Sequence, residues 1–304
     1  MTIALFTDAA CDLPARFLTD EHIGIVPIHL NLREQTFLDQ RKVSVALGFY
    51  KSYLADKNMA AETEPLSVRE MVAFFEKLVP EHEHVIFISI ASTRSKTYDH
   101  AMQAAITIAQ RHGRAGANGH KPCTIHVIDS QTLFTGQGVL VYEAVRELKR
   151  GGSYQELVDH IHAVAPKVQS YLVPDDLYFL RNRASKKGDD SIGFMRYLLG
   201  TALDMKPIVS ARLGETEVVA KARGFETAMQ QVFDTAGTAL DKGLAIPVVA
   251  ISYAGDPRTI ADTATYRDFS AKAKRHSVNV MISVMGPTGG INVGPGALAL
   301  SYAA

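Results

Sequence analysis

The chain reads VIFISIASTRSKTY from Val85 to Tyr98, and this stretch decides the fold. Its first half is a run of β-branched and aromatic residues, typical of a buried strand, and its second half is rich in hydroxyl groups. A pattern with helical spacing follows over residues 96–112. A buried strand that leads through a polar turn into a helix is the repeating unit of α/β folds with largely parallel sheets.

The same unit recurs along the whole chain, because short apolar runs alternate with stretches of helical spacing. The expected strands cover residues 3–7, 25–30, 85–90, 125–128, 170–173, 207–210, 248–253 and 280–284. The expected helices cover residues 43–55, 67–79, 96–112, 136–150, 153–165, 191–203, 224–241 and 257–274. We therefore expect an α/β fold with two lobes and largely parallel sheets flanked by helices.

The boundary between the lobes is expected near Pro166. Ala165-Pro166 ends a helical pattern, and a new strand begins just beyond it. A chain of 304 residues is long enough for two lobes of ordinary domain size. The sequence therefore predicts an N-terminal lobe of residues 1–166 and a C-terminal lobe of residues 167–304.

The composition argues against nucleic acid and anionic membranes as binding partners. Lysine and arginine total 32 residues and aspartate and glutamate also total 32, so the chain lacks the broad basic field of proteins that bind nucleic acid or anionic membranes. The N-terminus has no basic segment followed by a long apolar run, and no stretch reaches transmembrane length. We expect a cytoplasmic protein without a nucleic-acid partner or a stable membrane anchor.

Metal and cofactor motifs are absent from the sequence. Cys11 and Cys123 are too few for a disulfide framework, and Cys123 with His126 lacks the second pair of ligands that a zinc site needs. No serine lies in a Gly-x-Ser-x-Gly elbow, and no His-Glu-x-x-His segment occurs. We expect no catalytic residues, no metal and no cofactor.

Two hydroxyl-bearing segments precede helices and can contribute to a ligand site. Ser92, Ser95 and Thr97 lie where hydroxyls and free backbone N–H groups gather at a helix N-terminus, which suits an anion, although one serine can simply cap the helix. Thr63 precedes Ser67, which forms its own capping box with a glutamate three residues later. Thr63 is not needed for that cap, so its hydroxyl is available for a ligand.

A glycine-rich segment follows the last expected strand, from Gly286 to Gly296. Five glycines there indicate positive φ angles or a close approach of the backbone to another group. No Gly-Lys-Ser/Thr follows, and the segment lies too near the C-terminus to open a dinucleotide-binding unit. Nucleotide binding is therefore disfavoured.

In their order along the chain, these segments resemble the DegV family, which includes the fatty-acid-binding subunits of bacterial fatty acid kinases. The likeness covers essentially the whole chain and consists of several short motifs. They are Thr7-Asp8-Ala9-Ala10-Cys11-Asp12-Leu13-Pro14, Ile25-Val26-Pro27-Ile28, Val127-Ile128-Asp129-Ser130 with Gly136-Gln137-Gly138, Lys206-Pro207-Ile208, Ile251-Ser252-Tyr253-Ala254-Gly255-Asp256-Pro257 and Gly294-Pro295-Gly296-Ala297-Leu298.

The resemblance implies a long-chain fatty acid in a buried tunnel, with its carboxylate held by hydrogen-bond donors where the lobes meet. The implied ligand-binding residues are Thr63, Ser92, Ser95, Lys96, Thr97, Gly290 and Asn292. Three positions depart from the family pattern: Lys96 replaces a glycine, Ala9 a serine and Asn292 a histidine. An asparagine can still donate to a carboxylate but cannot carry a positive charge.

A basic run replaces the glycine-rich turn that the family usually has. It contains Arg181, Arg183, Lys186 and Lys187, which can form a solvated loop or a docking patch for a kinase subunit. The leading hypothesis is a protein that binds a fatty acid and presents it to a separate ATP-dependent kinase. The alternatives are a stand-alone enzyme acting on a phosphorylated or carboxylated metabolite, and a lipid-gated regulatory protein.

Overall fold

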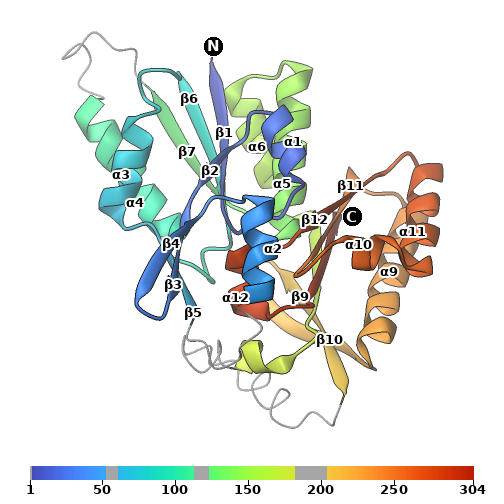
Figure 1. Cartoon of the computed structure of the whole chain (residues 1–304). Coiled ribbons are helices and arrows are strands. Elements are labelled where there is room, and N and C mark those ends of the chain that lie inside the picture. The colour runs from blue at the N-terminus through green and yellow to red at the C-terminus, as the bar shows by residue number, and fades with distance from the viewer. Residues whose placement is uncertain (1, 53–60, 113–122, 182–203) are drawn as a thin grey trace.

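The computed structural model describes residues 2–52, 61–112, 123–181 and 204–304. Their strands form three sheets, and helices pack against the faces of the two larger ones (Figure 1). The helix expected at residues 191–203 lies outside the described residues.

The first sheet has four parallel strands, as the βα repeats predict. Their order is β2 (Gly24–Val26), β1 (Ile3–Asp8), β6 (His84–Ser89) and β7 (Thr124–Asp129). The helices nearest this sheet are α1 (Ala15–Asp20), α3 (Val68–Glu76), α4 (Thr97–His112), α5 (Thr135–Arg150) and α6 (Tyr154–Val164). Phe87 packs with α3 and α4, whereas Ile86 and Ile88 pack with α5 and α6, because successive side chains of a strand face opposite ways.

The second sheet has six strands and is mixed. Their order is β10 (Glu215–Arg223), β9 (Met205–Arg212), β8 (Val168–Val173), β13 (Leu298–Ala303), β11 (Ile246–Tyr253) and β12 (Asn279–Val284). Strands β11 and β12 are parallel, and the other pairs are antiparallel. The expectation of largely parallel sheets is thus confirmed for the first sheet and wrong for the second. Its covering helices are α9 (Phe225–Lys242), α10 (Arg258–Ala261) and α11 (Ala264–Arg275).

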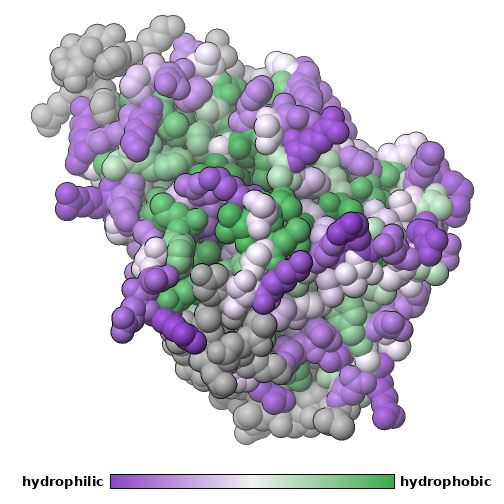
Figure 2. Space-filling model, in the orientation of Figure 1, coloured by the Kyte–Doolittle hydropathy of each residue, from purple (hydrophilic) through white to green (hydrophobic). Residues whose placement is uncertain are grey.

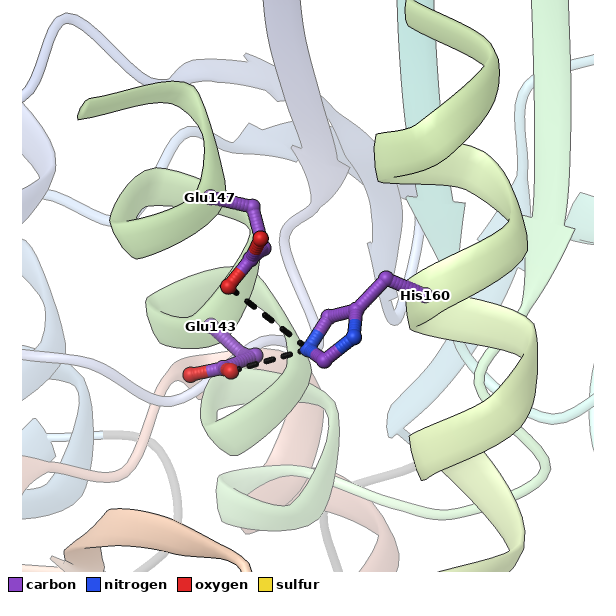
Figure 3. A group of neighbouring side chains, drawn as sticks. All are labelled: Glu143, Glu147 and His160. Carbon is purple, nitrogen blue, oxygen red and sulfur yellow. Dashed lines mark hydrogen bonds and ion pairs between the residues drawn. The ribbon is translucent and has the colours of Figure 1, made fainter. Parts of the chain in front are cut away.

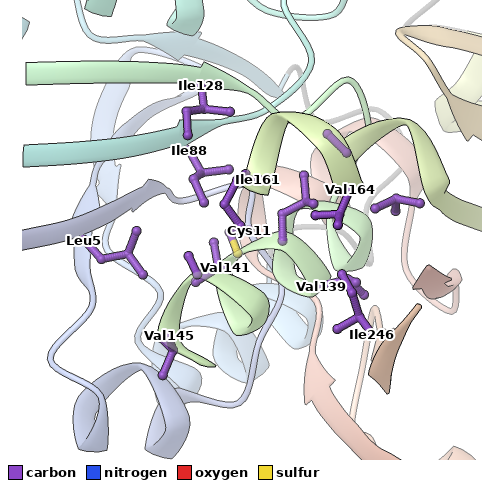
Figure 4. Packing of buried hydrophobic residues seen from close by; sticks show 14 of the residues in the cluster. Leu5, Cys11, Ile88, Ile128, Val139, Val141, Val145, Ile161, Val164 and Ile246 are labelled. Carbon is purple, nitrogen blue, oxygen red and sulfur yellow. The ribbon is translucent and has the colours of Figure 1, made fainter. Parts of the chain in front are cut away.

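Helix α5 lies between the two larger sheets. Its apolar residues share one core with Ile88 of β6 and Ile246 of β11 (Figure 4). Its first turn is also bonded to both sheets. The Thr135 hydroxyl lies 2.7 Å from the Ser301 hydroxyl of β13, and the Gln137 amide donates to Thr7 Oγ1 of β1 at 2.8 Å. A single helix therefore fixes the two sheets relative to each other.

A third sheet is small and antiparallel. It consists of β4 (Gln35–Asp39), β3 (Ile28–Leu32) and β5 (Ala61–Pro65). Helices α2 (Val43–Ser52) and α12 (Pro287–Val293) lie beside it, so a segment from the C-terminal part of the chain packs against one from the N-terminal part (Figure 1). A short 3-10 helix, η1 (Ala165–Lys167), leads into β8.

Several details differ from the expectations. The single strand expected at residues 25–30 is two strands in different sheets, separated by Pro27, which has no N–H group for a ladder bond. The glycine-rich segment contains helix α12, which is not among the expected helices, and the helix expected at 257–274 is two helices. All six strands of the mixed sheet begin after Lys167, although the lobe boundary itself stays a prediction.

Candidate functional site

A largely apolar cavity lies between the small sheet, the β6–α4 loop, the start of α5 and the six-stranded sheet. Its volume of about 130 Å³ is roughly ten times the space that one water needs. Its apolar lining residues are Ala10, Ile28, Pro65, Ile90, Leu133, Phe134, Leu172, Leu180, Val209, Ala211, Val293 and Ala299. Its polar lining residues are Thr63, Arg94, Ser95, Ser170, Tyr171, Thr216, Thr288 and Asn292.

Two of the predicted site residues meet in this wall, Thr63 from β5 and Asn292 from α12. Alternation along β5 turns Thr63 to the cavity while its neighbours Glu62 and Glu64 are exposed. The Asn292 amide nitrogen donates to Thr63 Oγ1 at 3.3 Å and to the Thr288 carbonyl at 2.6 Å. Thr63 can therefore still donate its own hydroxyl hydrogen into the cavity.

Asp39 fixes the helix that carries Asn292. Its buried carboxylate accepts from the Thr288 hydroxyl at 2.7 Å and from the Thr288 N–H at 3.0 Å, in the first turn of α12. A carboxylate bonded to an unpaired N–H group at a helix N-terminus stabilises the helix there. The Thr288 hydroxyl is consequently used by Asp39, even though Thr288 lines the cavity.

The β6–α4 loop supplies Ser95, which lines the cavity as predicted. Its hydroxyl lies 2.8 Å from Thr97 Oγ1 and accepts from the Thr97 N–H at 3.3 Å, so it caps the start of α4 as well. Thr97 is buried behind Ser95, and it is not among the cavity-lining residues. Ser95 therefore both lines the cavity and bonds to the first residue of α4.

Three other residues predicted to bind the ligand do not line the cavity. The Ser92 hydroxyl donates to Asp129 at 2.5 Å, so it holds the β6–α4 loop against the end of β7. The Lys96 side chain is exposed and does not line the cavity. Gly290 is buried against Tyr50, where a Cβ atom would come within 2.6 Å of the tyrosine hydroxyl oxygen, so a glycine is required for close packing.

The basic run is described only at its first residue. Arg181 directly follows Leu180, which lines the cavity. Arg183, Lys186 and Lys187 lie outside the described residues.

A buried ion pair lies beneath the helix α12. Arg41 Nη1 is 2.8 Å from Asp12 Oδ1, and both side chains are almost fully buried. Asp12 also accepts from the Ser252 hydroxyl of β11 at 2.7 Å and from the Gly286 N–H at 3.0 Å. Burial raises the pKa of Asp12, and the Arg41 guanidinium opposes this shift. The pair joins the N-terminal loop after β1 to the six-stranded sheet.

Sequence reasoning did not single out Thr288, Asp39, Arg41, Tyr50 and Arg94. Arg94 lines the cavity, and Tyr50 donates to the Met285 carbonyl at 2.9 Å. Asp39 ends the largely exposed strand β4, and nothing in the local sequence indicates that its carboxylate bonds to Thr288 of α12, 249 residues later. For Arg94, its position between Ser92 and Ser95 could have indicated that it lies near the predicted site.

A separate cluster of Glu143, Glu147 and His160 joins helices α5 and α6 (Figure 3). His160 Nε2 is 2.9 Å from Glu143 Oε1 and 3.8 Å from Glu147 Oε1. Arg146 lies 2.5 Å from the other oxygen of Glu143, and Arg150 pairs with Glu147. Two guanidinium groups thus balance two carboxylates, and we interpret the cluster as an ion-pair junction between the helices.

The fold and this cavity define a class of α/β proteins in which two larger sheets and a small third sheet surround an apolar cavity. A family model described as an uncharacterised protein of the DegV family matches residues 2–304. A DegV domain-containing protein from Xanthomonas axonopodis pv. citri is 36% identical and covers 100% of this chain and 98% of its own. The chain belongs to the DegV family.

Several solved structures have the same fold. DegV from Bacillus subtilis, described as a fatty acid binding protein, is 23% identical, covers 100% of this chain and 99% of its own, and has a TM-score of 0.80. A stearic-acid-binding protein from Eubacterium ventriosum is 19% identical, covers 99% and 98%, and has a TM-score of 0.79. Among the described residues, no helix is long and apolar enough to cross a membrane.

Proposed function

We propose that this protein binds a long-chain fatty acid, with the acyl chain along the apolar walls and the head group at Thr63, Ser95 and Asn292. The observation that carries the proposal is the cavity itself. Apolar side chains form most of its lining, while a few polar groups from separate elements gather on its wall. A small number of placed polar groups in an apolar pocket is typical of sites that orient an amphipathic ligand.

The descriptions of related structures support this assignment. The proteins from Bacillus subtilis and Eubacterium ventriosum are described as binding fatty acid and stearic acid, respectively. A third DegV-family structure, from Thermus thermophilus, is described by its fatty acid binding, with a TM-score of 0.78. These descriptions concern the relatives, and the residues of this cavity suit the same class of ligand.

Native mass spectrometry of the protein as isolated from its host, followed by identification of the ligand after denaturation, tests the assignment. We expect a copurifying fatty acid, displaced by added long-chain fatty acid. A copurifying phosphorylated metabolite would contradict the assignment and support the stand-alone enzyme instead.

We further propose that the protein presents its ligand to a separate ATP-dependent kinase, and that the basic run serves as the docking patch. The run begins at Arg181, next to cavity-lining Leu180, so a partner held there would be near the ligand. Charge reversal at Arg183, Lys186 and Lys187 is expected to weaken association with the kinase, since rim charges act mainly on encounter. Fatty acid affinity should change by less than about twofold, and a loss of affinity with unchanged association would contradict docking.

A further inference from the structure

Among the described residues that line the cavity, Arg94 has the only charged side chain. The ligand proposed above is itself charged, because a carboxyl group with a pKa of roughly 4 to 5 in water is ionised at neutral pH. Burying an ionised carboxylate in an apolar cavity is costly unless a paired charge and hydrogen bonds replace its hydration. Thr63 and Ser95 offer neutral donors, so the counter-charge has to come from another residue.

Asn292 does not supply this charge. Its amide is neutral, and its nitrogen already donates to the Thr288 carbonyl at 2.6 Å and to Thr63 Oγ1 at 3.3 Å. Its oxygen is an acceptor and is buried. The contribution of Asn292 is therefore indirect. By donating to the Thr63 oxygen, it leaves the Thr63 hydroxyl hydrogen available to the cavity.

The backbone that carries Arg94 is fixed at several points. The Arg94 N–H donates to the Ala91 carbonyl at 2.9 Å, and the Ser95 N–H donates to the same carbonyl at 3.2 Å. The Thr93 hydroxyl donates to the Gly214 carbonyl, which ties the β6–α4 loop to the turn between β9 and β10. A cation on a fixed turn, with its side chain partly buried, loses less freedom on binding a ligand than one on a free surface loop.

The guanidinium group suits a carboxylate. It has five N–H donors in a planar fork, so it can pair with both carboxylate oxygens and still keep the contact that Arg94 makes within the protein. Resting on the fatty-acid function proposed above, we infer that Arg94 is the charge partner of the bound carboxylate and makes the site selective for ionised fatty acids over neutral lipids with the same chain. Thr63 and Ser95 add neutral hydrogen bonds to the same head group.

The acidic residues near the cavity make such a cation necessary. Asp8, Asp39 and Asp129 accept hydrogen bonds from residues of the cavity wall or of the β6–α4 loop. None of the three is among the described residues that line the cavity, so a ligand does not contact them. Their negative charge disfavours a further carboxylate nearby, and the positive charge of Arg94 offsets this repulsion.

Dodecanoate and dodecan-1-ol have the same C12 chain and differ in charge, so the ratio of their affinities, measured by equilibrium dialysis at pH 7.5, reports the charge contact. We expect Arg94→Gln to weaken dodecanoate binding about tenfold or more, as for a lost hydrogen bond between charged groups, and alcohol binding by less than about twofold. Arg94→Lys keeps the charge and should retain part of the ratio. Lys96→Gln is the matched control, because it removes the same charge from the same loop at an exposed position and should leave the ratio unchanged.

An unchanged ratio in Arg94→Gln would overturn the inference and leave fatty acid binding intact. Equal losses for both ligands would show a structural role for Arg94, and an equal fall in Lys96→Gln would show a general field of the loop, so either result also contradicts the inference. Circular dichroism checks folding, and Arg94→Leu takes the place of Arg94→Gln if that variant does not fold. Failure of wild type to bind either ligand would instead overturn the proposed function.

Discussion

Thr63 and Thr288 carry the same side chain in one cavity wall, yet their hydroxyls have different tasks. Thr288 donates to Asp39 and secures α12, whereas Thr63 accepts from Asn292 and is proposed to donate its own hydrogen to the fatty acid head group. The sequence identified Thr63 and Ser95 through neighbouring helix caps and the family resemblance. It could not separate them from Lys96, because exposure depends on how the whole loop packs.

The first prediction concerns these donors. Thr63→Val and Ser95→Ala each remove one hydroxyl, and each should weaken fatty acid binding by about fivefold or more, as expected for one lost hydrogen bond. Lys96→Ala serves as the matched control from the same loop and should leave affinity unchanged, because its side chain is exposed. Equilibrium dialysis with folding checked by circular dichroism measures all three. Unchanged affinity in both hydroxyl variants would show that the head group binds elsewhere.

The second prediction concerns Asp8, whose pKa burial raises to about 6. In the unfolded chain the same carboxyl has a pKa of about 3.9. At a pH between about 4 and 6, Asp8 is therefore more protonated in the folded state than in the unfolded state. The contribution of Asp8 to stability is therefore largest below pH 4 and is lost as the pH rises toward 6. The contribution of Asp8 to the free energy of unfolding is therefore lower above pH 6 than below pH 4 by at most about 3 kcal/mol, from about two pKa units at 1.36 kcal/mol each.

Urea unfolding of wild type and Asp8→Asn at pH 4, 5, 6 and 7 checks this sign. The asparagine of the variant does not titrate, so the stability of wild type relative to the variant should decrease as the pH rises from 4 to 6 and then stay level. The backbone N–H groups of Ala10 and Ile90 bond to the two Asp8 oxygens, so the variant also carries a pH-independent offset. A relative stability that increases over this range would show a lowered pKa instead.

At the scale of elements, the sequence predicts the βα units and the antiparallel strands β8 and β9, but it does not predict the antiparallel strands β4, β5, β10 and β13. Strands such as β6 are apolar and fully buried, so their pattern is strong. Strands β4 and β10 are largely exposed edge strands with mixed polarity, so their sequences lack an apolar run that would predict a strand. Each is defined by its pairing with the preceding strand, β3 or β9. Strand β13 is apolar, but glycines and prolines before it hide its start.

Exposed apolar residues also mark the edge of the small sheet. Figure 2 shows hydrophobic surface over the region of the small sheet and α2. Phe37 and Leu38 of β4, with Val43 and Val45 of α2, are exposed by 40–54%. Their exposure explains why periodicity did not reveal β4. A hydrophobic run that is only partly buried gives no alternation between apolar and polar positions.

The third prediction tests the junction between α5 and α6. Glu143→Ala removes the partner of both His160 and Arg146, and we expect a loss of about 1–3 kcal/mol in the free energy of unfolding. His160→Ala should cost less, because Glu143 keeps Arg146. Urea unfolding of the single and double variants gives the coupling between them. Because arginines already balance the carboxylates, zinc should leave the Tm unchanged, and a zinc-dependent rise abolished by His160→Ala would contradict the ion-pair interpretation.

At the scale of the whole molecule, the cavity exists because segments distant in sequence are held together by buried polar contacts. Asp12 bonds to Arg41, Ser252 and Gly286, and α5 is bonded to both larger sheets. The sequence predicts that the two halves of the chain meet at the ligand. It does not predict the Asp12–Arg41 pair, since ion pairs between remote segments leave no periodic signal.

The last prediction is that this protein binds a fatty acid but does not itself catalyse phosphoryl transfer from ATP. The sequence contains neither a phosphate loop nor a recognisable set of carboxylates for magnesium, and the residues proposed to contact the head group are hydroxyls, an amide and Arg94. These proposed contacts include no carboxylate for the metal of the triphosphate, and their one cation is assigned to the fatty acid. The purified protein should therefore release no ADP when it is incubated with ATP, magnesium and fatty acid. Turnover that scales with protein concentration and is lost in Thr63→Val would show that the chain itself catalyses phosphoryl transfer, whereas turnover that persists in this variant indicates a contaminating ATPase.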